Sequence, residues 1–550
     1  MQITNYNASY EWAGTATASG SVSISGTGLI TVTGVAANTS STATITTTRT
    51  GYTGGSNTVT ATSLVAMSMV TVGDVGNAAG TTSYGAVSYY YQIGTYEVTG
   101  SQYTAFLNAV GSSDTYGLYN TSMGTDTKVA QISRSGTTGT YTYAVMNSTG
   151  QRPITYVSWF DSARFANWMS NGQPSGAQTS TTTENGAYNL NGATSGNAVV
   201  ANTVNPNTLL APTFRIPLEN EWYKAAYYSP NYGGAGVGGY WTWATQSNSA
   251  PGTTIGSSPN QASYDVYDAA TDVGSFSGSG SFYGTFDQSG NVWEWNDLNG
   301  IAGSNRGIRG GMWEYNSADV SSSTRMDYEP DNEDNDVGFR VASPVTLGAT
   351  GPGGGIIFYK HASGTFACGA TLNQNCTYLE VAPNTWSGGS ADPSKVWAVA
   401  ANESVDVPSI TNDSYAYNNA SGIGLGYKNS EAIVAQGNGT TTAAGAARAY
   451  GGGSQSDWYL PTTAELNVLC QWARNVPQSV TTPCTGGNLN TGTGASGGFS
   501  IDLYWSSSED DGIYGSIFAW LQNFFNGYQF ANPKYYYTVT TSSVRPVRAF

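Results

Sequence analysis

The sequence predicts an α+β protein built from several domains. A chain of 550 residues is too long for one hydrophobic core and suggests three or four domains. Its first 64 residues show the two-residue alternation of strands, whereas residues 65–345 contain helical spacing between aromatic segments. The 70 glycines predict many turns and long loops.

Residues 1–64 predict a small β-sandwich. The segments SVSISGTGLITVTG, STATITTTRTGY and NTVTATS alternate small polar with β-branched residues, and Gly and Asn separate them. The block resembles a bacterial immunoglobulin-like repeat, which implies a spacer or attachment domain.

Three helices are predicted between residues 65 and 345. Thr99 is placed to cap the first, whose apolar face carries Tyr103, Phe106, Leu107 and Val110. Ser158 and Asp161 have the spacing of a capping box for the second. The third is expected to begin at Pro217, because proline suits the first turn of a helix. The rest of the segment is expected to be loop and strand.

Six motifs in this segment occur in an order that identifies a family. They are YEVTGSQYTAFL (96–107), ITYVSWFDSARFANWM (154–169), FRIPLENEWYKAA (214–226), FDQSGNVWEW (286–295), RGIRGGMW (306–313) and VGFRVAS (337–343). Together they resemble the formylglycine-generating enzyme, or sulfatase-modifying factor, family. The resemblance implies a C-type-lectin-like α+β fold for residues 65–345, but it does not imply the chemistry.

The segment that carries catalysis in that family lacks the reactive residues here. The family uses two cysteines after its GG(S/M)W motif to hold copper, whereas residues 312–330 contain no cysteine. The single histidine, His361, excludes His-based triads. The carboxylates at 327–336 are interpreted as an exposed acidic loop, with a glycosidase pair as the alternative. We expect no enzymatic activity and no copper.

Calcium is the metal that the resemblance implies. In the family, a loop around the GNVWEW motif binds Ca²⁺ with side-chain and backbone oxygens, and hard oxygen ligands suit this ion. The matching positions here are Asp287, Gly290, Val292 and Glu294. The alternative is that the two carboxylates only accept hydrogen bonds from the turn.

Residues 346–550 resemble a second family. The motifs GPGGGIIFY (351–359), SDWYLPTTAEL (456–466), YWSSSE (504–509) and VRPVRAF (544–550) resemble the Lcl C-terminal domain of bacterial and phage adhesins. A weak internal symmetry pairs Ile216-Pro217 and Glu221 with Leu460-Pro461 and Glu465. We therefore expect two tandem C-type-lectin-like domains; the alternative is a chance match of short motifs.

The last 47 residues separate into two interleaved sets. The frame set contains Trp505, Ser507, Glu509, Trp520, Gln522, Phe524, Gly527, Gln529, Lys534, Arg545, Pro546 and Arg548. The filler set contains Asp510, Asp511, Tyr514, Ser516, Phe518, Phe525, Tyr528, Phe530, Asn532, Tyr535, Tyr536 and Tyr537. Tyr, Asn, Ser and Asp are typical of paratopes, because Tyr supplies rigid contact area and the others supply adaptable hydrogen bonds. The filler set therefore predicts a ligand-binding surface.

The Lcl resemblance adds a hypothesis about this surface. Members of that family often serve as variable proteins of diversity-generating retroelements, which implies that residues between Asp510 and Tyr537 are the diversified ones. A second candidate surface lies within 314–336, and its residues are Tyr315, Asn316, Asp327, Tyr328, Asn332, Glu333, Asp334 and Asn335.

The four cysteines predict two local disulfides. Cys368 precedes Cys376 by eight residues, and Cys470 precedes Cys484 by fourteen. Four cysteines allow three pairings, and pairing neighbours is favoured because each bond closes a short loop. Four reduced, buried thiols are the alternative. A zinc site is not expected, because the chain has no C-x-x-C motif.

The charge balance restricts the partners. A net charge of −16 repels nucleic acid and anionic lipid, so we expect neither as a partner. No signal peptide and no apolar stretch of membrane-spanning length is evident. With only 10% charged residues, the chain is expected on a virion, or on a bacterial surface as part of a longer exported protein.

These features together predict a receptor-binding adhesin, such as a phage tail-fibre protein, that recognises a cell-surface glycan or protein. Other virion or fibre subunits are expected as partners, and a homotrimer would add avidity. A structural decoration protein of a virion is the alternative.

Overall fold

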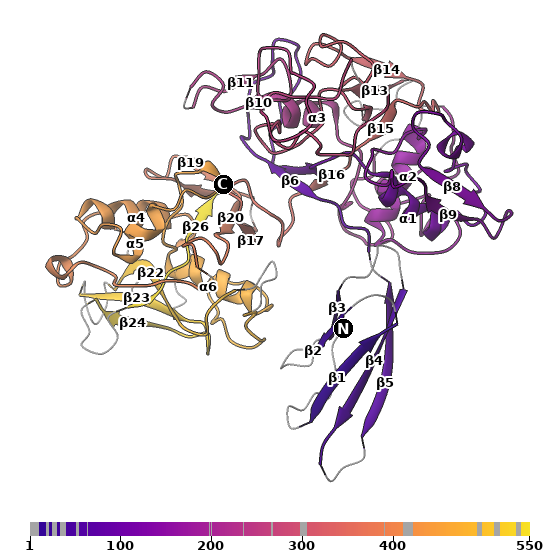
Figure 1. Cartoon of the computed structure of the whole chain (residues 1–550). Helices are drawn as coiled ribbons and strands as arrows, with labels where there is room; N and C mark the ends of the chain where they lie inside the picture. Colours follow the sequence, from indigo (N-terminus) through magenta and orange to yellow (C-terminus); the bar gives the residue numbers. More distant parts are fainter. Residues whose placement is uncertain are drawn as a thin grey trace. The chain divides into compact units, whose positions relative to one another are not determined.

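The computed structural model describes residues 10–17, 21–24, 30–33, 40–50, 54–62, 64–196, 199, 201–234, 236–265, 268–297, 305–362, 364–389, 391–410, 422–491, 498–510, 517–534 and 541–550. The chain divides into two compact units, Met1–Pro344 and Val345–Phe550 (Figure 1). Both units combine helices with strands, which confirms the predicted α+β class.

The chain begins with two small antiparallel sheets. Strands β1 (Glu11–Ala16), β4 (Ser40–Thr48) and β5 (Gly55–Thr62) form one sheet in the order β1-β4-β5, and β2 (Ser21–Ile24) pairs with β3 (Ile30–Thr33). Ile30, Ala43 and Ile45 form their shared core. A Cβ atom at Gly14 would lie 2.5 Å from Val22, so a glycine there allows β1 to approach β2 closely.

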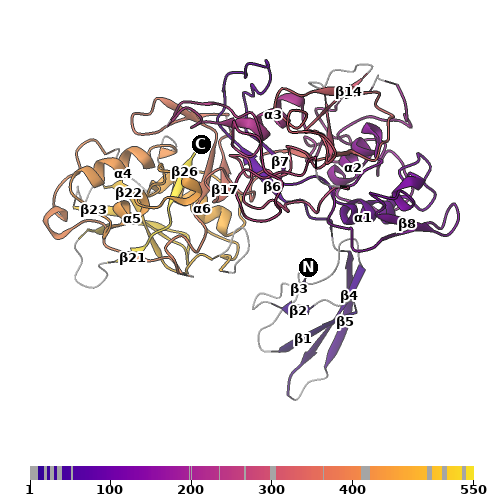
Figure 2. The same ribbon diagram turned by 45° about the horizontal axis from the view of Figure 1, so that its top comes forward.

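A three-stranded sheet joins the two ends of the next segment. Strand β7 (Tyr91–Gly94) lies between β6 (Met69–Val72) and β16 (Ala342–Pro344), in antiparallel pairing with both. Residues about 250 positions apart in the sequence therefore meet in one sheet. Figure 2 shows β6 and β7 side by side.

The predicted helix caps are confirmed. Helix α1 (Gly100–Val110) begins after Thr99, whose side chain accepts from the backbone of Gln102, and α2 (Trp159–Ser170) begins after the Ser158–Asp161 capping box. The two helices meet through aromatic rings, with Phe106 5.4 Å from Phe165 and 5.2 Å from Trp168 between ring centroids. Such aromatic pairs contribute about 0.5–1.5 kcal/mol each beyond the area they bury.

The third helix begins later than predicted. Helix α3 (Glu219–Tyr227) starts two residues after Pro217, because Leu218 is still extended and its N–H donates to Glu221. A four-stranded sheet follows in the order β14-β13-β12-β15. Its strands are β12 (Trp293–Asn296), β13 (Arg306–Arg309), β14 (Met326–Tyr328) and β15 (Val337–Phe339). The remaining elements are β8 (Ile132–Ser135), β9 (Thr142–Val145), β10 (Tyr228–Ser229), β11 (Gly239–Tyr240) and the short helix η1 (Thr121–Gly124).

In the second unit, too, a three-stranded sheet contains strands from both ends of the segment. Strand β20 (Tyr378–Val381) lies between β17 (Ile356–Lys360) and β26 (Val547–Ala549), so the start and the end of this unit share one sheet. A five-stranded sheet has the order β21-β25-β22-β23-β24. Its strands are β21 (Ser394–Lys395), β22 (Leu503–Glu509), β23 (Phe518–Asn523), β24 (Gln529–Pro533) and β25 (Ser542–Ser543).

Helices cover both faces of the five-stranded sheet (Figure 2). Tyr504 packs in the core that holds α6 (Thr463–Ala473), whereas its neighbour Trp505 packs in the core that holds α4 (Gly426–Ala435) and α5 (Ala443–Arg448). Adjacent strand residues point to opposite faces, so the sheet is buried on both sides. The unit also contains the hairpin β18 (Phe366–Cys368)–β19 (Gln374–Cys376) and the short helices η2 (Ala400–Asn402) and η4 (Gly452–Ser454).

Candidate functional site

The predicted ligand-binding segment contains a hairpin at the edge of the five-stranded sheet. Strands β23 and β24 are antiparallel, with Leu521 opposite Phe530 and Gln522 opposite Gln529. Among the described strands, β24 is last in the sheet order and pairs with β23 alone. The connecting turn spans residues 524–528. The hairpin therefore lies at the edge of the sheet.

The frame residues of this segment are all buried. Ten of them are less than 10% exposed, namely Trp505, Ser507, Glu509, Trp520, Gln522, Phe524, Gln529, Lys534, Arg545 and Arg548, and Gly527 and Pro546 are buried with them. Phe524 packs on Tyr504 with their ring centroids 4.3 Å apart. The residues that the sequence separates as a frame are thus the ones that hold the strands in place.

Three of the six described filler residues are exposed. Phe525 is 69% exposed, Tyr528 55% and Phe530 38%, while Phe518 and Asn532 are half-buried. Asp510 is only 2% exposed, so the prediction that it faces solvent is wrong. It follows Glu509 at the end of β22, and its backbone N–H donates to Phe518 of the neighbouring strand, which draws the residue into the sheet.

Six filler residues lie outside the described residues. They are Asp511, Tyr514, Ser516, Tyr535, Tyr536 and Tyr537. We refer to Phe525, Tyr528 and Phe530 as the hairpin patch.

The turn that carries Phe525 and Tyr528 of the hairpin patch is held by three kinds of contact. The Asn523 side chain accepts from the backbone N–H groups of Phe525 and Asn526, at 2.8 and 3.2 Å. Arg474 donates to the carbonyl oxygens of Phe524 and Phe525, at 2.8 and 3.1 Å. Gly527 has φ +81° and lies against Cys484, where a Cβ atom would be 1.6 Å from the carbonyl oxygen. The aromatic side chains therefore project from a backbone that is fixed before any ligand binds.

A buried ion pair anchors the far end of the hairpin. Lys534 contacts Glu509 with both side chains fully buried, and its ammonium also donates to the carbonyl oxygen of Val405 at 3.1 Å. Burial raises the pKa of Glu509 and lowers the pKa of Lys534, and the attraction between the two charges opposes both shifts. The Lys534 ammonium lies 4.5 Å from the centre of the Trp397 ring.

The predicted disulfide pairing is confirmed. Cys368 bonds to Cys376 across the β18–β19 hairpin, and Cys470 of α6 bonds to Cys484. The second bond joins the helix under the sheet to the residue that contacts Gly527. All four cysteines of the chain are used in these bonds.

The residues predicted to bind calcium form a different network. Glu294 accepts hydrogen bonds from Arg340, at 2.5 Å from Nε and 2.6 Å from Nη2, and a further one from the Trp222 indole at 2.7 Å. Asp287 accepts from the backbone N–H of Gly274 at 2.6 Å. Gly290 and Val292 are buried beside them. The set does not fit a calcium ion, because Glu294 would first have to give up Arg340.

The second candidate surface has a mixed arrangement. Tyr315 packs edge-on against the Trp293 ring, and Glu333 accepts from the Asn120 amide at 2.5 Å. Burial raises the pKa of Glu333 to about 7 and the pKa of Asp336 to about 6. Asp334 and Asp327 are exposed, whereas Asn335 is half-buried. Part of this acidic segment is therefore structural.

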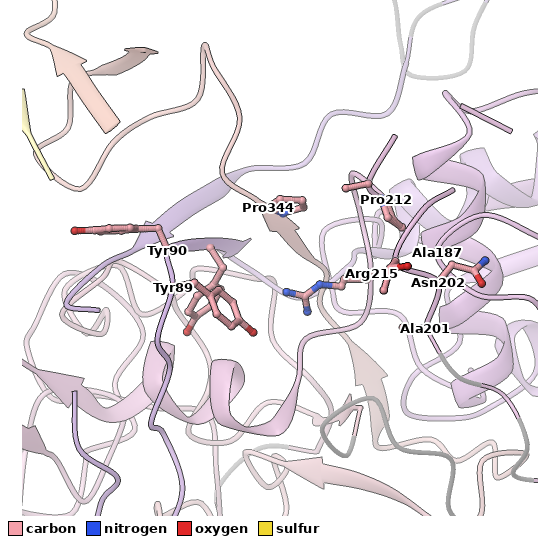
Figure 3. Close-up of a pocket in the computed structure, with 11 residues that line it drawn as sticks. Tyr89, Tyr90, Ala187, Ala201, Asn202, Pro212, Arg215 and Pro344 are labelled. Atoms are coloured by element: carbon pink, nitrogen blue, oxygen red, sulfur yellow. The ribbon is translucent and has the colours of Figure 1, made fainter. Parts of the chain in front are cut away.

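The sequence did not single out a pocket in the first unit. It has a volume of about 250 Å³, and its wall includes Tyr89, Tyr90, Tyr91, Pro212, Arg215 and Pro344 (Figure 3). The run of three tyrosines at the start of β7 is visible in the sequence, but Arg215 lies more than 120 residues further along the chain. Only the fold brings these residues together.

The described residues lack two further features. No helix among them is long and apolar enough to cross a membrane. Nor do three or more His, Cys, Asp or Glu side chains of the described ranges gather in a group that could hold a metal ion.

The solved structures that match the chain have low sequence identity to it and low TM-scores. Treponema denticola variable protein 1 is 21% identical with a TM-score of 0.32, and the match covers 54% of this chain and 98% of that one. CarF is 19% identical with a TM-score of 0.32, covering 52% and 100%. PvdO from Pseudomonas aeruginosa is 18% identical with a TM-score of 0.27, covering 50% and 92%. No curated protein matches the sequence.

The family model gives the assignment. The model of the sulfatase-modifying factor enzyme 1-like domain matches residues 54–345, which is more than half of the chain. The match spans the six motifs that start at residue 96 and the sheet that closes on β16. The chain therefore belongs to the sulfatase-modifying factor enzyme 1-like family.

Proposed function

We propose that the chain is a receptor-binding protein that recognises a cell-surface glycan or protein through the hairpin patch and its neighbours. The observation that carries this proposal is the separation of roles in the last 47 residues. The frame is buried, while Phe525, Tyr528 and Phe530 are exposed on the β23–β24 hairpin, whose turn is held by Asn523, Arg474 and the Cys470–Cys484 bond.

The chemistry of the patch suits recognition. Large aromatic side chains that face solvent mark interaction sites, and Tyr and Phe provide contact area with few rotatable bonds. A fixed backbone lowers the entropy lost on binding. Substitution at these positions would leave the core unchanged, since the three side chains point away from it. The same property would let a diversity-generating retroelement vary the surface without unfolding the protein.

The sulfatase-modifying factor-like domain is proposed to act as a platform without catalytic activity. Residues 312–330 contain no cysteine, and the four cysteines of the chain form disulfides in the other unit. No thiolate is therefore available to hold copper or to attack a substrate. The two sheets at the start of the chain are proposed to form an immunoglobulin-like spacer, and residues 346–550 a second lectin-like domain.

The proposed location is outside the cell. Disulfides persist in oxidising surroundings, and two of them brace the domain that carries the patch. A phage virion, for example a tail fibre, or a bacterial surface would provide that setting. Other fibre subunits are the proposed partners, and a homotrimer would present three patches, so that weak single contacts add up to avidity.

Sequencing of natural populations tests the proposal. The gene's 3′ end would be sequenced from many members of one source population. Substitutions should concentrate at the filler positions, including Phe525, Tyr528 and Phe530, and spare Trp520 and Lys534. An even spread, or no variation at all, would favour a fixed-ligand adhesin or a structural virion protein.

A binding experiment distinguishes a fixed-ligand adhesin from a structural virion protein. The labelled chain would be applied to a panel of bacterial cells, with the double variant Phe525→Ala/Tyr528→Ala as the probe of the patch. Loss of cell binding in the variant supports recognition. A structural decoration protein would show no binding by either form, and a patch-independent adhesin would bind equally in both.

A further inference from the structure

The pocket in the first unit combines rings with hydrogen-bonding groups. Tyr89 and Pro212 contribute rings to its wall. Asn202, Thr203 and Arg215 contribute polar side chains to the same wall. Figure 3 shows Tyr89 and Asn202 on opposite sides of Arg215. The volume of about 250 Å³ is slightly below the range of ~300–1,000 Å³ typical for drug-sized ligands, so the pocket suits a ligand with a single ring.

The pocket has little net charge. Arg215 donates to both oxygens of Glu221, at 2.6 Å from Nη1 and 2.5 Å from Nη2, so its charge is balanced within the protein. The Tyr89 hydroxyl also donates to Glu221, at 2.9 Å, and Tyr89 therefore offers a ligand its ring rather than its hydroxyl. An ionised ligand would leave water without gaining a counter-ion, so a neutral ligand is favoured.

Three side chains of the pocket keep unused hydrogen-bonding capacity within the described part of the chain. The Asn202 amide donates to Asn185 and Gly186, at 2.9 and 3.0 Å, which leaves its Oδ1 as an acceptor. No described group bonds to the Thr203 hydroxyl, which both donates and accepts. Nε of Arg215 donates to no atom of the described residues, and the side chain is 20% exposed. The pocket therefore offers a ligand both donors and acceptors.

The loop that follows Thr203 is fixed before a ligand binds. The backbone N–H of Asn205 donates to the carbonyl oxygen of Leu210 at 2.8 Å, which closes the loop. The fully buried Asn205 amide donates to Ser170 and Asn171, at 3.2 and 2.9 Å. A polar group held in place in this way loses little entropy when a ligand binds.

We propose that this pocket binds one neutral sugar residue of a glycan. Each sugar hydroxyl both donates and accepts, so one ring pairs with Oδ1 of Asn202, the Thr203 hydroxyl and Nε of Arg215. The C–H face of the sugar packs on the Tyr89 ring. A ligand with acceptors alone would leave Asn202 unpaired, and a ligand with donors alone would leave Arg215 unpaired, and each unpaired group weakens binding. This inference concerns the sulfatase-modifying factor-like domain and does not rest on the hairpin patch.

Saturation-transfer difference NMR of the full chain tests the proposal. The probes are the neutral monosaccharides D-glucose, D-galactose, D-mannose, L-fucose, L-rhamnose and N-acetyl-D-glucosamine, and saturable binding of at least one of them is expected. Thr203→Val removes the hydroxyl and keeps the shape of the side chain, so it should weaken that binding by about three- to tenfold. Thr440→Val, at an exposed threonine of the other unit, is the matched control and should bind as the unchanged chain does.

A second pair of variants locates the bound sugar. Ala211 is exposed and lines the pocket, so Ala211→Trp places an indole ring in the pocket and should abolish the binding. Ala391→Trp, at an exposed alanine of the other unit, should leave the binding unchanged. Unchanged melting temperatures establish that the four variants fold.

Several results would overturn the proposal. One is the absence of saturable binding by any sugar of the panel. Another is equal binding by the two members of either variant pair. A third is displacement of the sugar by N-acetylglycinamide, which would make the pocket a peptide site. The Phe525→Ala/Tyr528→Ala variant should bind the sugar normally, so the test is independent of the receptor-binding proposal; loss of binding in that variant would instead place the sugar on the hairpin patch.

Discussion

At the scale of single residues, Glu294 shows how a position in a family motif can serve stability. Its carboxylate is fully buried against the Arg340 guanidinium and the Trp222 indole. Glu294→Gln leaves that guanidinium without its main counter-ion, although Glu97 remains 3.9 Å away. We expect the free energy of unfolding of the first unit to fall by about 3–5 kcal/mol, measured by urea denaturation.

The matched control is Glu314→Gln. Glu314 pairs with Lys128 at the surface, where both side chains are more than 40% exposed, so the loss should be much smaller than that of Glu294→Gln. Equal losses in the two variants would contradict the argument. A chelator should leave the melting temperature unchanged; a fall that added calcium restores would instead show that the chain binds calcium.

In the β23–β24 hairpin, Gly527 is the residue least able to accept a side chain. Its φ of +81° and its contact with Cys484 both exclude a side chain. Gly527→Ala should destabilise the second unit by at least about 1–3 kcal/mol and weaken ligand binding by the patch. Gly439→Ala, where a Cβ atom would meet nothing within 4 Å, should change neither. Equal melting temperatures for the two variants would show that the turn adapts.

At the scale of elements, the start of α6 depends on one carboxyl group. Glu465 accepts from the backbone of Thr462 and Gly424 and from the Tyr459 hydroxyl, at 2.9, 2.8 and 3.0 Å. Burial raises the pKa of Glu465 from 4.5 to about 7. Between these values the folded protein keeps a proton that the unfolded chain releases, so the free energy of unfolding falls as the pH rises from 4.5 to about 7.

Glu465→Gln tests this pH dependence. The variant cannot titrate at this position, so the unfolding free energy of the second unit should decline less steeply across the same pH window. Glu431→Gln, at an exposed position on α4, should leave the decline in place. An identical slope in the Glu465→Gln variant and the unchanged chain would assign the pH dependence to other groups.

At the scale of the whole molecule, the two units differ in how they are braced. Both disulfides lie in the second unit, and the first unit, which contains no cysteine, is held by packing, hydrogen bonds and buried ion pairs. Calorimetry with a reductant should therefore lower only the transition of the second unit, by a stability loss on the order of 2–5 kcal/mol for each bond. If both transitions shift together, the units unfold as one.

Local chemistry explains which features could be predicted from the sequence. The caps at Thr99 and Ser158 and the two disulfides join residues at most fourteen positions apart, so their spacing alone indicates them. The frame and filler sets of the hairpin were also separated by residue type alone. The structure agrees in that the frame residues are buried and Phe525, Tyr528 and Phe530 are exposed.

The sequence by itself determined the α+β class, the family of residues 54–345, the helix caps and the disulfide pairing. Only the tertiary structure decided the ion pair of Glu294 with Arg340, the burial of Asp510, and the pocket between Tyr89 and Arg215. The physical reason is distance along the chain. Capping and short-loop closure act between near neighbours, whereas burial and ion pairing depend on segments that only the complete fold brings into contact.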